Sequence, residues 1–170
     1  ADVIDGGNGV DTVDYGSTIS TGPKSDTKAG ISIDLKLPTA QQGGDAQGDI
    51  LKNIENVIGT DYDDLFAGDA KANEFEGWTG GNTISYASSP TGVTVDLTLY
   101  TAQVSTGDAS GDVLHNIRSA IGSAYNDVLK GMGESTLTGG DGNDTLDGGR
   151  GNGSPLYGGN GNGRAPAARA

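Results

Sequence analysis

Large apolar residues recur singly along this chain, separated by polar residues and glycine. Written from Gly59 in rows of nine, the sequence reads GTDYDDLFA, GDAKANEFE and GWTGGNTIS without a gap. Each row opens with Gly, has Asp or Asn at its sixth position and has a large apolar residue at its eighth. A helix would need more apolar residues per turn and would be opposed by the repeated glycines. The pattern instead predicts a three-residue strand with an inward middle side chain, followed by a glycine-rich turn.

The same row recurs elsewhere in the chain. A run from Gly122 reads GSAYNDVLK, GMGESTLT, GGDGNDTLD, GGRGNGSPLY and GGNGNGRAP, and single rows stand at 6–14, 44–52 and 107–115. The sixth-position residues are Asp11, Asp49, Asp64, Asn73, Asn82, Asp112, Asp127 and Asp144. Two rows would close one flattened coil, and coils would stack at the strand spacing of roughly 4.8 Å. The sequence therefore predicts an all-β protein, a parallel β-solenoid.

A longer duplication contains these rows. Residues 30–37 match 92–99, residues 44–68 match 107–131, and TVDY at 12–15 echoes TISY at 83–86. The repeated unit predicts four parts: the end of a preceding roll with a variable connector (1–29), two tandem larger units (30–91 and 92–163) and a disordered tail (164–170). The chain begins without Met, in the middle of a repeat, and is interpreted as an excerpt of a longer protein.

Two further patterns lie within the larger units. NIENVI at 53–58 and NIRSAI at 116–121 are interpreted as shortened rows, which would stack Asp49 on Asp64 and Asp112 on Asp127. ISIDLKL and VTVDLTL alternate between apolar and polar residues, which predicts one buried face of a longer strand. The residues of that face are Ile31, Ile33, Leu35, Leu37, Val93, Val95, Leu97 and Leu99.

The charge of the chain favours a cation as partner. The net charge is −13, with 19 Asp against 4 Glu, so nucleic acid and anionic membranes would be repelled. Cysteine is absent and there is a single His, which excludes thiolate and multi-histidine metal sites. Calcium takes six to eight oxygen ligands at variable angles, which suits glycine turns with exposed carbonyls and Asp side chains. No apolar run approaches the roughly 18 residues that span a bilayer.

Other interpretations of the acidic residues are weaker. The stretch from Asp141 lacks the Gly and Glu that an EF-hand loop requires. Stacked repeats bring carboxylates together without a substrate cleft, so acidic pairs carry no catalytic information here. His115 aligns with Lys52 of the other unit and is expected to be exposed. The sequence predicts no catalytic residues, and the chain is not expected to be an enzyme.

Two rows carry the resemblance to a known family. GGNGVDTVD and GGDGNDTLD match every fixed position of G-G-x-G-x-D-x-U-x, the calcium-binding nonapeptide of hemolysin-type RTX proteins, where U is a large apolar residue. The resemblance implies a parallel β-roll with several Ca²⁺ ions, each shared between rows n and n+2. Asp127 would then face Asp144, and Asp64 would face Asn82. The implied ligands are the sixth-position residues with the glycines Gly59, Gly122, Gly139, Gly140 and Gly142.

The resemblance also carries a functional expectation. It implies a segment of an exported or cell-surface bacterial protein that passes a type I channel and folds on calcium outside the cytosol, as a scaffold, adhesin or surface-layer module. The alternative is an accessory module of a secreted enzyme, such as a protease, lipase or alginate epimerase, with its catalytic domain outside this chain. The open ends of a solenoid permit end-to-end self-association or attachment to the cell surface.

The last two rows depart from the pattern. Gly153 and Gly163 stand at the sixth position, and Pro155 replaces the apolar residue at the eighth. No ion is expected near these positions, and the solenoid is expected to fray there.

Overall fold

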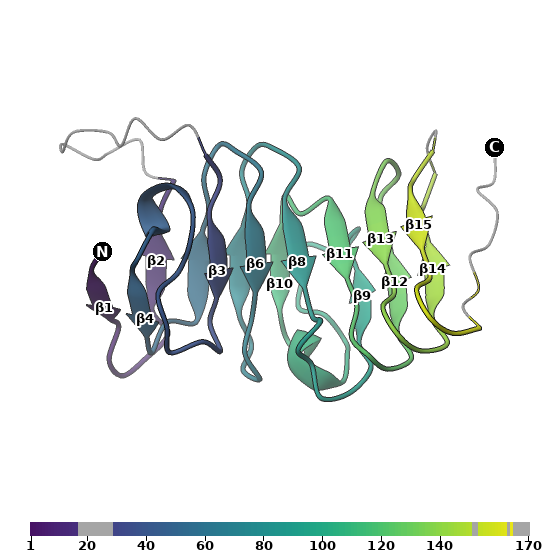
Figure 1. Cartoon of the computed structure of the whole chain (residues 1–170), viewed down its shortest axis with the longest axis horizontal. Helices are drawn as coiled ribbons and strands as arrows, with labels where there is room; N and C mark the ends of the chain where they lie inside the picture. The colour runs from purple at the N-terminus through teal and green to yellow at the C-terminus, as the bar shows by residue number, and fades with distance from the viewer. Residues whose placement is uncertain (17–28, 151–152, 163, 165–170) are drawn as a thin grey trace.

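The computed structural model describes residues 1–16, 29–150, 153–162 and 164. Among these residues, short strands lie side by side across the long axis, from the N-terminal end of the molecule to the C-terminal end (Figure 1). The strands are β1 (Val3–Asp5), β2 (Thr12–Asp14), β3 (Ser32–Asp34), β4 (Ile50–Lys52), β5 (Asn56–Ile58), β6 (Leu65–Ala67), β7 (Glu74–Glu76), β8 (Thr83–Ser85), β9 (Thr94–Asp96), β10 (Val113–His115), β11 (Ser119–Ile121), β12 (Val128–Lys130), β13 (Thr136–Thr138), β14 (Thr145–Asp147) and β15 (Leu156–Tyr157). Two single turns of 3₁₀ helix, η1 (Gly44–Ala46) and η2 (Gly107–Ala109), interrupt them.

The core is a ladder of the middle residues of these strands. Phe66, Phe75 and Ile84 are fully buried, whereas their neighbours along each strand face outward at least in part. Every pairing between strands is parallel and in register, so that Val57, Phe75 and Leu114 stack in one sheet. The rings of Phe66 and Phe75 meet across the core with centroids 5.3 Å apart. The predicted parallel β-roll is confirmed.

The strands form four sheets. Their orders are β1-β4, β10-β7-β5-β2, β15-β13-β11-β8-β6-β3 and β14-β12-β9. The pairings repeat after six strands: β1 with β4 corresponds to β7 with β10, β2 with β5 to β8 with β11, and β3 with β6 to β9 with β12. The connections repeat as well, because Gln41 and Gln103 each accept a hydrogen bond from the Asp that ends the preceding strand. The strand pairings and their connections therefore repeat along the chain, once over β1–β6 and again over β7–β12.

The shortened rows do form strands, but the predicted stacking of their neighbours is wrong. Only three residues separate β4 from β5, and Asn53 turns the chain with φ 51°; Asn116 does the same before β11 with φ 57°. These tight turns put β4, β5 and β6 in three different sheets, so the coil has three strands here instead of two. Asp49 and Asp64 consequently precede strands of different sheets, as do Asp112 and Asp127.

The longer alternating strands are also shorter than predicted. β3 and β9 have three residues each, and Leu37 and Leu99 are 48% and 37% exposed. The N–H of Leu37 donates to the carbonyl of Asp34, and Leu99 donates to Asp96 in the same way. The chain thus turns immediately after each strand. Leu37 and Leu99 lie outside the core, whereas Leu97 is buried in it and Leu35 is partly buried against it.

In the row at 148–157 the inward apolar residue lies one position later than the eighth. Leu156, not Pro155, pairs with Leu137, because the extra residue of this row moves the ladder position along the chain. Ser154 then stands where other rows have Asp. The expectations for residues 17–28, for Gly163 and for 165–170 lie outside the described residues. Within the described part of the chain, neither helical turn has the length or apolarity to cross a bilayer.

Candidate metal sites at the strand corners

We call a buried or partly buried Asp, Asn or Glu that directly precedes a strand a corner residue. In the nonapeptide rows it is the sixth residue, and in the rows that open at Gly6, Gly59, Gly68, Gly77, Gly122 and Gly139 its side chain lies against that first glycine. A Cβ on Gly59, Gly77, Gly122 or Gly139 would come closer than 3.0 Å to the side chain of the corner residue in its own row. Glycine is therefore required at the first position by space, and the corner is a polar cage of side-chain and backbone oxygens.

Two predicted pairs of corner residues do face one another. The N–H of Asp127 donates to Oδ1 of Asp144 at 3.0 Å, and the N–H of Asp64 donates to Oδ1 of Asn82 at 3.0 Å. The corner residues of stacked coils are thus connected through backbone donors. The side chains differ in how their remaining polar atoms are satisfied.

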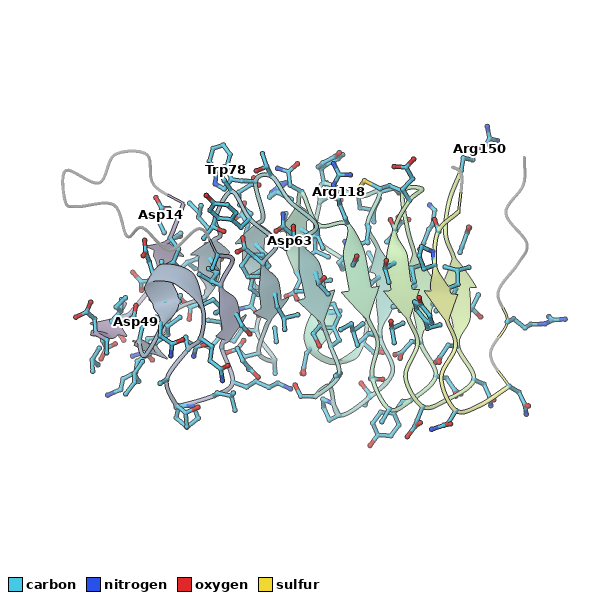
Figure 2. All side chains as sticks on the ribbon, turned by 45° about the horizontal axis from the view of Figure 1, so that its top comes forward. Asp14, Asp49, Asp63, Trp78, Arg118 and Arg150 are labelled. Atoms are coloured by element: carbon cyan, nitrogen blue, oxygen red, sulfur yellow. The ribbon has the colours of Figure 1, made fainter. Side chains whose placement is uncertain are left out.

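The carboxylates of Asp49 and Asp112 each accept a hydrogen bond from a tyrosine hydroxyl. Asp49 accepts hydrogen bonds from the N–H of Asp2 (2.8 Å) and the hydroxyl of Tyr15 (3.1 Å). Asp112 accepts from the N–H of Asn73 (2.9 Å) and the hydroxyl of Tyr86 (2.8 Å). Figure 2 shows Asp49 near the N-terminal end of the solenoid, well apart from Asp63. The sequence signal for these donors is the Tyr that follows both TVD and TIS.

Asp64 and Asp127 are satisfied by hydroxyl groups of their own rows. Both oxygens of Asp64 accept bonds, from the N–H of Ile31 (2.9 Å) and from the N–H and hydroxyl of Thr60 (2.7 and 2.8 Å). Asp127 is held in the same way by the N–H of Val93 (2.7 Å) and by the N–H and hydroxyl of Ser123 (2.6 and 2.9 Å). These donors were not predicted from the sequence; their signal is Thr or Ser in place of the second Gly of the row.

Asn73 and Asn82 place a carboxamide at the corner. Nδ2 of Asn82 donates to the carbonyls of Gly77 (2.6 Å), Thr79 (3.0 Å) and Asn116 (3.1 Å). Nδ2 of Asn73 donates to the carbonyl of Glu55 at 3.0 Å. At both corners the amide group thus lies against backbone carbonyl oxygens.

Glu55, the corner residue of a shortened row, has a counter-ion. Lys71 Nζ lies 2.6 Å from its Oε1. The hydrogen bond from Lys71 lowers the pKa of Glu55.

Two corner residues keep an unsatisfied oxygen. Asp11 Oδ2 and Asp144 Oδ2 are buried and have no hydrogen-bond partner among the described residues. They belong to the two rows that match the nonapeptide at every fixed position, where Gly7 and Gly140 leave no hydroxyl at the second position. Asp144 is 1% exposed, and burial raises its pKa. A buried carboxylate oxygen without a partner is costly unless a cation or proton compensates it, so both corners fit a metal ion.

The donor set at these corners is made of oxygen. No group of three or more Asp, Glu, His or Cys side chains is placed to hold one ion in the part of the chain that the structure describes. A cation beside Asp144 would therefore take backbone carbonyls as further ligands. Gly140 and Gly142 have φ values of 99° and 125°, which open the turn in a conformation that favours glycine. Hard oxygen ligands on an adaptable loop suit Ca²⁺ better than Mg²⁺.

The buried carboxyl group of Asp112 should make the stability of the fold depend on pH. Burial raises the pKa of Asp112 from 3.8 to about 7. Since the folded state binds this proton more tightly than the unfolded chain does, the group stabilises the fold at low pH, and that contribution is lost between about pH 4 and pH 7. Between pH 5 and pH 8 this group should lower the free energy of unfolding of the parent by on the order of 2 kcal/mol. Asp112→Asn removes the titrating group, so we expect the variant not to show this loss. Urea unfolding in EGTA at both pH values measures this, and an unchanged pH dependence would contradict it.

Comparison with known families agrees with the geometry. The chain matches the family model of the RTX calcium-binding nonapeptide repeat in four copies, over residues 1–19, 58–88 and 121–154. The matched segments include both rows with an unsatisfied corner oxygen. They also include the rows of Asp64, Asn82 and Asp127.

Proposed function

Because the chain belongs to the proteins built from the RTX calcium-binding nonapeptide repeat, we propose that it is a structural β-roll module of an exported or cell-surface protein, stabilised by calcium at its glycine corners. The observation that carries the proposal is the Oδ2 of Asp144, which is buried and has no hydrogen-bond partner in the described part of the chain, in a row that matches the repeat at every fixed position. Asp11 Oδ2 supplies the same evidence in the row at 6–14. RTX repeats bind calcium; the assignment of ions to these two corners is the proposal.

Each residue of the Asp144 corner has a separate part. The Asp144 carboxylate offers Oδ2 to the cation, while its Oδ1 stays bonded to the N–H of Asp127 and keeps two coils in register. Gly139 leaves room for the carboxylate, and Gly140 and Gly142 shape the turn that presents carbonyl oxygens. When bound, calcium supplies the positive charge that the carboxylate lacks. Because the unfolded chain lacks this cage, binding stabilises the folded state.

The charge and composition support export. Extracellular calcium modules work at roughly 10⁻⁴ to 10⁻³ M, far above cytosolic levels. A net charge of −13 and the absence of Cys suit a chain that crosses a membrane channel before its carboxylates are neutralised by calcium. The proposed role outside the cell is a scaffold, spacer or adhesin stalk. An accessory position beside a catalytic domain predicts the same calcium chemistry and differs only in residues outside this chain.

Calcium should stabilise the parent, and Asp144→Asn should remove part of that effect. At a calcium concentration of 100 times Kd, one site adds about 2.7 kcal/mol, which raises Tm by about 5–10 °C for a chain of this size. Asn keeps the acceptor for Asp127 and replaces the unpartnered oxygen by an NH₂ group, as in Asn82. We therefore expect the variant to be more stable than the parent in EGTA and less responsive to CaCl₂. Thermal unfolding followed by circular dichroism measures both changes.

A matched control lies three residues further along the chain. Asp147 is exposed, and among the described residues its Oδ1 accepts a hydrogen bond only from the N–H of Gly149. Asp147→Asn removes the same charge but should keep the full calcium response. A parent Tm that is identical in CaCl₂ and in EGTA would refute the proposed function.

A further inference from the structure

We propose that the middle of the solenoid is built to hold together without metal, and that calcium acts only on the rows at 6–14 and 139–147. Seven corner residues between these rows are satisfied within the protein: five carboxylates have a hydrogen-bond donor or counter-ion, and two carboxamides donate to backbone carbonyls. They are Asp49, Glu55, Asp64, Asn73, Asn82, Asp112 and Asp127. The inference rests on the proposed function for the rows at 6–14 and 139–147. It goes beyond that function by assigning the repeats between them a different chemistry.

Asn82 shows the substitution most directly. Its side chain is fully buried, and its single NH₂ group lies against three backbone carbonyls. A cation at this point would contact the same oxygens and would have to displace the amide. Because the carboxamide is neutral, it also removes one negative charge from the stack that Asp64 begins. The corner is complete without an ion.

The internal duplication supplies independent support. Thr60 and Ser123 occupy matching positions of the two units and make the same pair of hydrogen bonds to Asp64 and Asp127. Tyr15 and Tyr86 likewise match, and they donate to Asp49 and Asp112. Each donor replaces part of what an ion would provide. The same metal-free arrangement therefore occurs twice in one chain, in contrast to the two full-consensus rows.

The polar corners in the middle are also buried deeply enough to exclude competition from water. Asp64, Asn82, Asp112 and Asp127 are all 2% exposed or less. In such surroundings a satisfied hydrogen bond is strong and an unsatisfied one is costly. Removal of calcium should consequently unfold the rows at 6–14 and 139–147, while the middle of the solenoid keeps its structure. This differs from the sequence-based expectation that the whole segment folds only on calcium.

Hydrogen exchange measured by mass spectrometry on the full chain tests the proposal. In EGTA, peptides covering β5, β6, β8 and β11 should stay protected, and adding CaCl₂ should change their exchange rates less than twofold. Peptides covering residues 1–14 and 139–150 should gain at least tenfold protection with CaCl₂. Equilibrium dialysis should find two calcium ions per chain, one for each row with an unsatisfied oxygen.

The outcomes separate this proposal from the one on which it rests. Loss of protection along the whole chain in EGTA, or binding of clearly more than two ions, would overturn the metal-free middle and leave the proposed function intact. Absence of bound calcium, with exchange unchanged everywhere, would refute the proposed function itself. Protection of the middle together with calcium-dependent ends supports both.

A pair of conservative variants tests the donors themselves. Tyr86→Phe removes one hydroxyl from the corner of Asp112, and we expect at least tenfold faster exchange of the β10 amides in EGTA. Tyr62→Phe is the matched control, because Tyr62 is 41% exposed and its hydroxyl has no hydrogen bond among the described residues. Equal exchange in both variants would show that the tyrosine does not replace an ion and would overturn the assignment.

Discussion

Replacement of Asn82 by Asp should destabilise the metal-free protein by about 3–5 kcal/mol, the range for an uncompensated charge in a buried site. The substitution changes only one NH₂ group into an oxygen. That oxygen would face the carbonyls of Gly77, Thr79 and Asn116 with no donor among them. A proton on the new carboxyl could satisfy only one of the three carbonyls, so the loss should be large at neutral pH and smaller in acid.

Calcium should reverse most of this loss. With a carboxylate at position 82, the corner becomes a cage of oxygens, and a cation can take the place that the amide held. Urea unfolding of Asn82→Asp in EGTA and in CaCl₂ measures the difference between the two conditions. Asn56→Asp is the control, because its Oδ1 accepts the N–H of Glu74 on an outer strand position and this bond survives the change. Equal stability of Asn82→Asp and the parent in EGTA would contradict the role given to the carboxamide.

The ladder of buried residues could be predicted from the sequence because the coils repeat along a single axis. Each row contributes one inward residue, such as Phe66 or Leu146, and a spacing of nine is enough to place these residues in a ladder. The facing of Asp127 and Asp144 was implied by the resemblance to the RTX β-roll, in which rows n and n+2 share an edge. Where the period changes, as at 53–58, spacing predicted the strand correctly but not its sheet. The direction of the chain there depends on the positive φ of Asn53, a property that the row pattern does not contain.

The sequence predicts only in part how the oxygens of the corner residues are satisfied. The sequence marks Asp64 and Asp144 alike, since both stand at the sixth position before a strand. What distinguishes them is the second position, Thr60 in one row and Gly140 in the other, together with backbone donors that only stacking brings near. Ile31, 33 residues before Asp64, is such a donor. Long-range contacts of this kind distinguish the corner oxygens that have a hydrogen-bond donor from those that have none among the described residues.

Gly122→Ala should cost about 3 kcal/mol or more, because overpacking a closed site forces the backbone to move. A Cβ at this position would come closer than 3.0 Å to the carboxylate of Asp127 and to the carbonyl oxygen of Gly139. Neither neighbour can retreat easily. The carboxylate is fixed by the N–H groups of Val93 and Ser123. The Gly139 carbonyl belongs to backbone that is stacked on the next coil. The φ angle of Gly122 is not in the left-handed region, so the expected loss comes from space alone.

Gly158→Ala is the matched control, since Gly158 opens a row in the same way but a Cβ added to it would meet no other atom within 4 Å. This variant should be neutral or stabilising by about 0.5 kcal/mol, through the lower entropy of the unfolded chain. Urea unfolding of both variants in CaCl₂ and in EGTA gives the comparison. If crowding at the corner is the cause, Gly122→Ala should lose stability in both conditions, because the Asp127 corner is satisfied by hydrogen bonds whether or not calcium is present. A loss confined to CaCl₂ would instead place an ion at Asp127 and extend the calcium sites beyond the rows at 6–14 and 139–147.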